Sequence, residues 1–293
     1  YTPLPKVNQK WEFEYAYQTV IRTFHSFSPR FATEAKRVRD AHRLDLPVAP
    51  NKRNGAYTFG SAPEEPCFIL HNWAGTYNDT STLAHELGHA VHAQLAGRHS
   101  IFVNHAPLAI AETASIFSEM ILAEELMQEK KNDAFTRQIL STQLQDAFAS
   151  IPRQVFFTRF EQQAFDMIKE GKTILEINNA YYQTLRTQFG KKMHIPENAQ
   201  YEWGMVGHMF EHPFYTYSYA FGQLLVLAFF ERYQKEGKDF VRDYERFLSH
   251  GGSEHTEKIL REMGFHPEKR KSWEKGLKIL EQKFKTLQKL GIE

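Results

Sequence analysis

The chain has 293 residues, enough to bury a full hydrophobic core in one large domain or in two small ones. Its 36 lysines and arginines balance 35 aspartates and glutamates, and no long block carries a single sign of charge, so we expect no nucleic-acid partner. The longest uninterrupted apolar run, residues 224–230, is far shorter than the ~20 residues that a membrane-spanning helix needs, so we expect no transmembrane segment either.

The N-terminal part of the chain predicts two helices. Residues 1–6 lack both an initiator methionine and the apolar stretch of a signal peptide, so the chain is either a processed form or a fragment, and we favour a fragment. Apolar residues recur at steps of three and four from Phe13 to Phe24, which predicts an amphipathic helix that Ser28-Pro29 ends. A second helix is expected over residues 31–43.

The only β-structure that the sequence predicts lies between residues 45 and 71. Two prolines and the Asn54-Gly55 turn signal interrupt the helical pattern there, and residues 55–60 and 67–71 have the composition of two short strands. Cys67 is the only cysteine, which excludes an internal disulfide and a cysteine-based zinc site and suits a reducing compartment. We therefore expect a cytosolic protein.

From Thr82 onward almost every segment predicts a helix. Prolines and glycines mark the ends, because proline is tolerated in the first turn of a helix and glycine commonly follows the last. The expected helices cover residues 82–96, 107–129, 132–149, 153–170, 174–189, 213–235, 238–249, 254–263 and 267–289. We predict a single, mainly α domain over residues 1–293, with a small β-sheet or hairpin beside the helix that begins at Thr82.

That helix carries the sequence His85-Glu86-Leu87-Gly88-His89. Two histidines four residues apart on a helix project from one face, about one turn from each other, as two ligands of a tetrahedral zinc must. Glu86 lies about 100° further round the helix, where it can act as general base on water at the metal without being a ligand. We therefore predict a zinc metallopeptidase in preference to an ordinary helix with two surface histidines.

Two further residues of this helix are unusual. A glycine inside a helix costs about 1 kcal/mol relative to alanine, so we expect a neighbouring backbone or side chain to come close to Gly88. His92 continues the face of the two histidines, but three ligands from one helix would point past a single metal ion. We expect His92 to pack near the site or to support a ligand.

A catalytic zinc needs a third protein ligand and an open coordination position. The metzincin pattern is excluded, because it requires a glycine at position 92 and a histidine at position 95, where this chain has His92 and Leu95. The gluzincin solution takes a glutamate from the next helix. Glu112 fits it, since it lies in the otherwise small and apolar run 107–115, where a carboxylate needs a partner.

Three other residues have weaker claims near this site. Glu119 lies seven residues after Glu112 and shares its helix face, so it either receives an N–H from a zinc-bound histidine or lies on a solvated surface. His99 and His105 are alternative candidates for the third ligand.

A second group of polar aromatic residues lies in the segment 203–222. Hydrolysis of an amide requires donors aimed at the developing oxyanion, and histidine N–H and tyrosine O–H groups supply them without competing for the metal. Two histidines and three tyrosines lie between His208 and Tyr219. Without the zinc motif, this segment would be interpreted as core packing at a helix start; with it, we expect oxyanion donors here.

Several of these segments together resemble the M3 family of zinc metallopeptidases, and most closely its oligoendopeptidase F members. They are residues 82–92, 109–115, 208–222 and 247–253, and residues 53–57 resemble a family segment that borders the substrate cleft. The resemblance spans nearly the whole chain. Known members are longer and have an N-terminal helical half that restricts substrates to short peptides, so this chain corresponds to their catalytic C-terminal half.

The resemblance implies a gluzincin-type helical fold and a cytosolic, zinc-dependent endopeptidase that cuts internal bonds of short oligopeptides. Carried over by position, His85, His89 and Glu112 bind one zinc ion per chain. Glu86 activates the zinc-bound water.

The resemblance also assigns the oxyanion side of the site. His208 and tyrosines of residues 215–219 stabilise the tetrahedral intermediate. The family's spacing falls across three tyrosines, and we rank Tyr215 and Tyr219 ahead of Tyr217.

Two other functions share parts of this pattern. A metallocarboxypeptidase of related helical fold would have the same zinc helix but would recognise the C-terminal carboxylate of its substrate. A non-catalytic helical binding protein would keep the motif as a structural zinc site, but such sites have four protein ligands and the sequence offers three. Internal cleavage of a peptide with both ends blocked distinguishes the endopeptidase.

Overall fold

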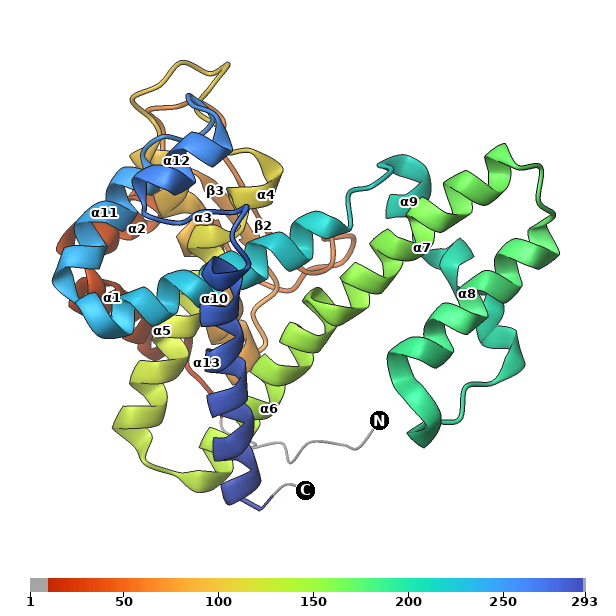
Figure 1. Cartoon of the computed structure of the whole chain (residues 1–293). Helices are drawn as coiled ribbons and strands as arrows, with labels where there is room; N and C mark the ends of the chain where they lie inside the picture. The colour runs from red at the N-terminus through yellow and green to blue at the C-terminus, as the bar shows by residue number, and fades with distance from the viewer. Residues whose placement is uncertain (1–9, 292–293) are drawn as a thin grey trace. The chain divides into compact units, whose positions relative to one another are not determined.

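The structure is a computed structural model that describes residues 10–291 (Figure 1). Our expectation for residues 1–6 lies outside the described residues. The described chain is mainly helical and contains a small three-stranded sheet, which confirms the predicted fold class. It divides into two compact units, residues 10–142 with 224–291 and residues 143–223. A single domain over residues 1–293 stays a prediction.

The first unit consists of helices and the sheet. Its N-terminal elements are α1 (Phe13–Phe27), α2 (Pro29–Asp40), β1 (Leu44–Asp45), β2 (Ala56–Phe59), β3 (Phe68–His71), α3 (Tyr77–Leu95), α4 (Leu108–Ala111) and α5 (Thr113–Lys130). Its C-terminal elements are α11 (Lys238–Leu248), α12 (Thr256–Glu262) and α13 (Arg270–Lys289). Helices α6 (Asp133–Ser150) and α10 (Tyr217–Glu236) each contain one of the two points where the chain passes between the units. None of the helices within residues 10–291 is long and apolar enough to cross a membrane.

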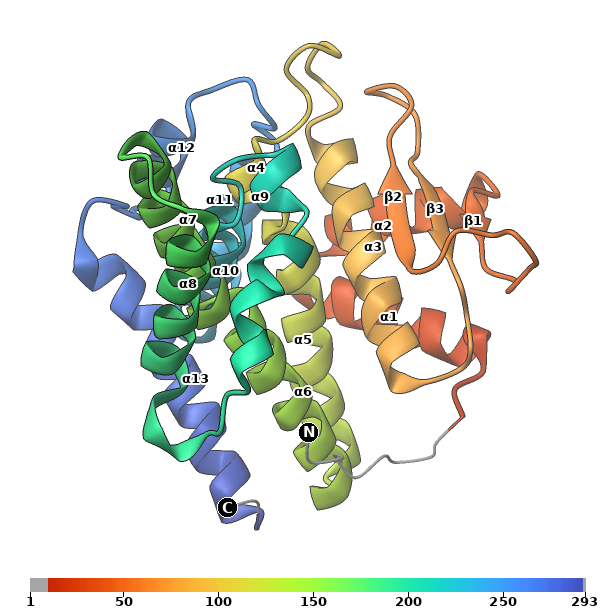
Figure 2. The same cartoon turned by 90° about the vertical axis from the view of Figure 1, so that its right-hand side faces the viewer.

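The sheet lies beside α3, as predicted (Figure 2). β2 and β3 form the expected hairpin and pair antiparallel, with Ala56 opposite His71 and Phe59 opposite Phe68. β1 pairs parallel with β3, so the strand order is β1-β3-β2. With only two residues, β1 is too short to show an alternating pattern in the sequence. β2 is one of the two edge strands, and it packs against α3.

Capping places the helix starts earlier than we predicted. Ser28 accepts a hydrogen bond from the N–H of Phe31, so α2 begins at Pro29. At the start of α3, the Thr76 hydroxyl accepts the N–H of Asp79 at 3.1 Å, and the Asp79 carboxylate accepts the N–H of Thr76 at 2.8 Å. This capping box starts α3 at Tyr77, so the predicted start at Thr82 is wrong.

α3 and α5 are in close contact at Gly88. A Cβ atom at this position would lie 2.7 Å from the carbonyl oxygen of Ala114, 2.7 Å from Oγ of Ser118 and 2.9 Å from Cα of Ser115. All three neighbours belong to α5, so the expected close approach is confirmed. The missing side chain lets the helix with the two histidines approach the helix that follows Glu112.

Buried aromatic rings fill the core on the other side of α5. The Phe117 ring lies 4.6 Å from that of Tyr244 in α11 and 5.2 Å from that of Phe27 in α1. Burial raises the pKa of Tyr244 well above its ordinary value, so its hydroxyl stays protonated. This hydroxyl donates a hydrogen bond of 2.8 Å to the carbonyl of Thr113, which ties α11 to the first residue of α5.

The second unit packs two helices and several short elements around its own core. The elements are α7 (Pro152–Lys169), α8 (Ile174–Phe189), the 3-10 helices η1 (Gly190–Lys192) and η2 (Glu197–Met205), and α9 (His208–Glu211). The rings of Phe160 in α7 and Tyr181 in α8 are 4.8 Å apart in this core. We predicted α7 and α8, but not η1, η2 or α9, which are too short for helical periodicity.

The segment before α10 is a turn and not the start of the predicted helix 213–235. Phe214 has φ of 62°, in the left-handed region, which a right-handed helix cannot contain. Residues 212–216 therefore form a turn, hereafter the Tyr215 turn, and α10 begins at Tyr217.

Gly88→Ala should lower the free energy of unfolding by about 1–3 kcal/mol, because the methyl group would overlap backbone atoms of α5. Thermal unfolding of both proteins measures the effect. Gly204→Ala is the matched control, since a Cβ atom at Gly204 meets nothing within 4 Å. Equal unfolding temperatures for Gly88→Ala and the parent would mean that α3 and α5 can move apart at this position without loss of stability.

Candidate active site

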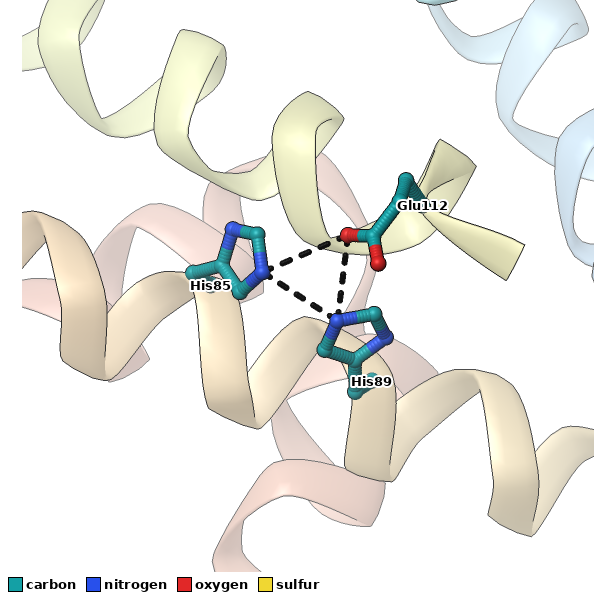
Figure 3. A group of neighbouring side chains, drawn as sticks. All are labelled: His85, His89 and Glu112. Carbon is teal, nitrogen blue, oxygen red and sulfur yellow. Dashed lines mark hydrogen bonds and ion pairs between the residues drawn. The ribbon is translucent and has the colours of Figure 1, made fainter. Parts of the chain in front are cut away.

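Three side chains from two segments converge at one point, which we call the donor triangle: His85, His89 and Glu112 (Figure 3). The histidines project from one face of α3, and Glu112 faces them from between α4 and α5. Nε2 of His85 lies 3.1 Å from Nε2 of His89 and 3.3 Å from Oε2 of Glu112. Oε2 of Glu112 lies 3.2 Å from Nε2 of His89. The structure thus brings together the three residues that the sequence proposed as ligands.

The donor triangle has the dimensions of one face of a zinc coordination tetrahedron. Zinc bonds nitrogen and carboxylate oxygen at about 2.0–2.2 Å, and tetrahedral geometry then separates neighbouring ligand atoms by about 3.3–3.6 Å. The three separations, 3.1, 3.2 and 3.3 Å, lie close to that range. Two imidazoles and one carboxylate also match the donor set of a catalytic zinc, in which a fourth corner stays open to water or substrate. The residues therefore fit such an ion.

Glu112 reaches the donor triangle because the chain breaks its helix there. We predicted one helix over residues 107–129, but α4 ends at Ala111 and α5 begins at Thr113. The Thr113 hydroxyl donates to the carbonyl of Ile110 at 2.6 Å, and the Ser115 hydroxyl donates to Oε2 of Glu112 at 2.7 Å. The bond from Thr113 competes with the backbone ladder of a continuous helix. The bond from Ser115 fixes the direction of the Glu112 carboxylate.

Glu119 contacts a histidine of the donor triangle from behind. Its Oε1 lies 2.6 Å from Nδ1 of His85, and its Oε2 accepts a hydrogen bond of 2.9 Å from the Ser81 hydroxyl. Of the two roles that the sequence left open for Glu119, the geometry favours support of the ligand. When Nδ1 donates to this carboxylate, Nε2 is left with a lone pair that faces Glu112 and His89. The sequence analysis did not single out Ser81 for this role.

The charges of the donor triangle favour a cation. Burial lowers the pKa of His85, but Glu112 and Glu119 outweigh it and raise this pKa to about 10. Burial acts to raise the pKa of Glu112, but His85 and His89 outweigh it and hold this pKa well below its usual range. Because the carboxylates stabilise positive charge at this point, protons and a metal ion compete for the same atoms.

The other histidines near the motif lie outside the donor triangle. His92 is buried; burial and the nearby His89 lower its pKa to about 4, while a hydrogen bond with the backbone of Ala111 opposes this shift. It is therefore neutral and packs beside Glu112, as we expected. Nε2 of His99 lies 2.9 Å from the carbonyl of Ser249. Within the described residues, neither His99 nor His105 joins the group that could hold a metal.

Glu86 is next to His85 in sequence but not part of the donor triangle. Its side chain is buried, and its Oε2 accepts a hydrogen bond of 2.6 Å from the Thr58 hydroxyl. The same hydroxyl lies 2.9 Å from the Glu86 carbonyl. Thr58 belongs to β2, so the edge of the sheet orients this carboxylate. We did not predict a role for Thr58 from the sequence. Strand alternation with the exposed Tyr57 and Phe59 is a signal that directs it towards α3.

His208, Tyr215 and Tyr219 form a contact group of their own in the second unit. The ring of His208 lies 5.0 Å from that of Tyr215 and 5.7 Å from that of Tyr219. The two tyrosine rings meet edge to face at 5.2 Å, and the Tyr219 hydroxyl lies 3.5 Å from Nε2 of His208. Tyr217, in contrast, is 51% exposed. The ranking of Tyr215 and Tyr219 ahead of Tyr217 as oxyanion donors stays a prediction.

Solved structures contain the same helical fold. A proposed peptidase from Chlamydophila abortus matches 96% of this chain and 48% of its own, with a TM-score of 0.85 and 26% sequence identity. A model of peptidase family M3 matches residues 22–279. The chain belongs to peptidase family M3, a family of metallopeptidases, which confirms the resemblance seen in its sequence.

Two bacterial relatives match nearly the whole chain. Oligopeptidase PepF of Bacillus subtilis (strain 168) is 29% identical over 294 aligned positions, gaps included, and the match covers 99% of this chain and 44% of the relative. The chromosomal oligoendopeptidase F of Lactococcus lactis subsp. cremoris is 27% identical over 293 aligned positions, and the match covers 99% of this chain and 48% of the relative. The chain thus spans about half the length of the curated relatives that it matches.

Glu119→Gln should weaken metal retention by about 10- to 100-fold, because a neutral amide is a poorer acceptor for the Nδ1–H of His85. Competition with a chromophoric chelator measures the affinity. Glu129→Gln, on the same helix but paired with Arg22, serves as the control and should retain metal like the parent. Parental affinity in Glu119→Gln would show that this contact does not support the ligand.

Proposed function

We propose that the chain is the catalytic part of a zinc-dependent endopeptidase that hydrolyses internal bonds of short oligopeptides. The observation that carries the proposal is the donor triangle of His85, His89 and Glu112. Glu86 follows His85 directly in sequence, and Thr58 orients its carboxylate. Membership of peptidase family M3 supports the reaction class. The names of the relatives, oligopeptidase and oligoendopeptidase, support oligopeptides as the substrates.

Zinc is the metal we propose, one ion per chain. Nε2 of His85, Nε2 of His89 and Oε2 of Glu112 would hold it. Two imidazoles favour zinc over magnesium or calcium, which prefer sites made only of oxygen atoms. Bound there, zinc supplies a Lewis acid that polarises a carbonyl group and lowers the pKa of water.

We assign proton transfer to Glu86. Its carboxylate would take a proton from the attacking water and deliver it to the nitrogen of the leaving amine. The hydrogen bond from Thr58 supports this role, because a base that is already oriented loses less entropy in the reaction. Burial also leaves Glu86 little contact with bulk water.

We assign stabilisation of the oxyanion to His208, Tyr215 and Tyr219. Negative charge develops on the scissile carbonyl oxygen only as the water adds to the carbon, so donors at that oxygen act mainly on kcat. The mutual contacts of the three rings support a common role.

A cytosolic location belongs to the same proposal. Cys67 is the only cysteine and is a buried, free thiol, whose pKa burial raises to about 11. Such a thiol is protonated at neutral pH and suits a reducing compartment.

The proposal predicts that the purified protein holds about one zinc ion per chain, that a chelator abolishes its activity, and that added zinc restores it. The substrate is a fluorogenic peptide with both termini blocked, and elemental analysis measures the metal. Cleavage of this peptide at an internal bond supports the endopeptidase. Cleavage only of peptides with a free C-terminal carboxylate would instead indicate a carboxypeptidase, and tightly held zinc without hydrolysis would indicate a structural site.

Glu86→Gln should lower kcat by about 10²–10⁴-fold while zinc content and KM stay near parental values, because the amide cannot accept the proton. Steady-state kinetics with metal analysis tests this. Thr58→Val keeps the shape but removes the hydroxyl that orients Glu86, so it should cause a smaller loss of kcat and no loss of zinc. If zinc is lost together with activity in Glu86→Gln, this carboxylate supports the metal and is not the base.

A further inference from the structure

The Tyr215 turn holds a backbone conformation that its own sequence disfavours. Phe214, directly before Tyr215, has φ of 62°. Left-handed backbone is strained for a residue with a bulky side chain and persists only where the surrounding structure imposes it. Of the four non-glycine residues with positive φ in residues 10–291, Phe214 is the only hydrophobic one, so local side-chain hydrogen bonding does not explain it.

α7 holds this turn on both sides of Tyr215. The backbone N–H of Phe214 donates a hydrogen bond of 2.8 Å to Oε1 of Glu161. The hydroxyl oxygens of Thr158 and Thr216 lie 2.8 Å apart, within hydrogen-bond distance. Thr158 and Glu161 are three residues apart and so share one face of α7. The residue before Tyr215 and the residue after it are therefore bonded to the same helix face.

Each of these polar contacts has one buried partner. Glu161 is 2% exposed and Thr216 is 1% exposed. Phe214 also contacts α7 through its ring, 5.0 Å from that of Phe165, but both side chains are 38% exposed. The two hydrogen bonds are thus better placed than the ring contact to hold the turn.

Burial of the Glu161 carboxyl group costs free energy, and only one of its oxygens gains a hydrogen bond in return. Its second oxygen, Oε2, has no hydrogen-bond partner among the described residues. Burial raises the pKa of Glu161, and the hydrogen bond from the N–H of Phe214 opposes this shift. An apolar residue of similar size would fill the space without desolvating a carboxyl group. The carboxyl group's contact with the strained backbone of Phe214 explains its presence in the core of the second unit.

We infer that Glu161, assisted by Thr158, is a positioning residue that clamps the Tyr215 turn and so fixes the Tyr215 ring beside that of His208. A donor for an oxyanion must be in place before charge develops, and a displacement of about 1 Å can cost about 10²-fold in rate. The inference rests on the proposed function in one respect, the role of Tyr215 as a donor. The clamp itself rests on the geometry of the second unit alone.

The test compares Glu161→Ala with Glu161→Gln in the zinc-loaded protein. The alanine removes the acceptor for the N–H of Phe214, whereas glutamine keeps an acceptor oxygen at the same place. We expect faster amide hydrogen exchange in the peptide that contains residues 212–216, and a kcat lower by about 10- to 100-fold at nearly unchanged KM, for Glu161→Ala only. Thr158→Val is the second variant, in case Glu161→Ala does not fold, and should show the same changes to a smaller degree.

The same substitutions in a Tyr215→Phe background separate positioning from general stability. If the clamp acts through the Tyr215 hydroxyl, Glu161→Ala should cost no further kcat once that hydroxyl is removed, although exchange in the turn should still accelerate. Parental exchange in both Glu161→Ala and Thr158→Val would overturn the clamp, as would a Glu161→Gln protein as impaired as Glu161→Ala. Faster exchange with unchanged kcat would support the clamp and contradict the proposed role of Tyr215 instead.

Discussion

The close contact between α3 and α5 at Gly88 is the constraint on which the donor triangle depends. His85 and His89 belong to α3, whereas Glu112 lies immediately before α5, so the spacing of two helices sets the distances between the three donor atoms. Backbone atoms of α5 occupy the space that a side chain at Gly88 would need. Any larger residue there would move the histidines and the carboxylate apart. The stability cost of a glycine within a helix is therefore offset by the geometry of the site.

Hydrogen bonds then orient the side chains of the donor triangle at this helix spacing. Ser81 bonds Glu119, Glu119 contacts Nδ1 of His85, and Ser115 bonds Glu112 from the other side. Each carboxylate thus accepts a hydrogen bond from a hydroxyl group and also faces a histidine ring. Glu119 uses a different oxygen for each contact, whereas Glu112 uses Oε2 for both. Groups held in this way need little rearrangement when a cation binds, which is the advantage of a preorganised site.

Sequence alone could predict the parts of this site that depend on local spacing. The four-residue step between His85 and His89 and the apolar surroundings of Glu112 are both readable without neighbours in space. The break at Glu112 was not predictable, because it involves a local bond from the Thr113 hydroxyl to the carbonyl of Ile110 that competes with the helical backbone bonds. The left-handed Phe214 was equally hidden, since its partner Glu161 lies in another helix. The partnership of Thr58 with Glu86 likewise requires a strand to pack against a helix.

The hydrogen bond from the Tyr244 hydroxyl to the Thr113 carbonyl links the core to the site in a way that bears on how such a chain can evolve. Phenylalanine at this position would fill the same volume among the same rings, but it would remove a buried hydrogen bond to the carbonyl of the residue directly after Glu112. The constraint on Tyr244 therefore acts through the donor triangle as well as through packing. The aromatic core is not uniformly tolerant of substitution, because the polar atom of this member points towards the break in the helix.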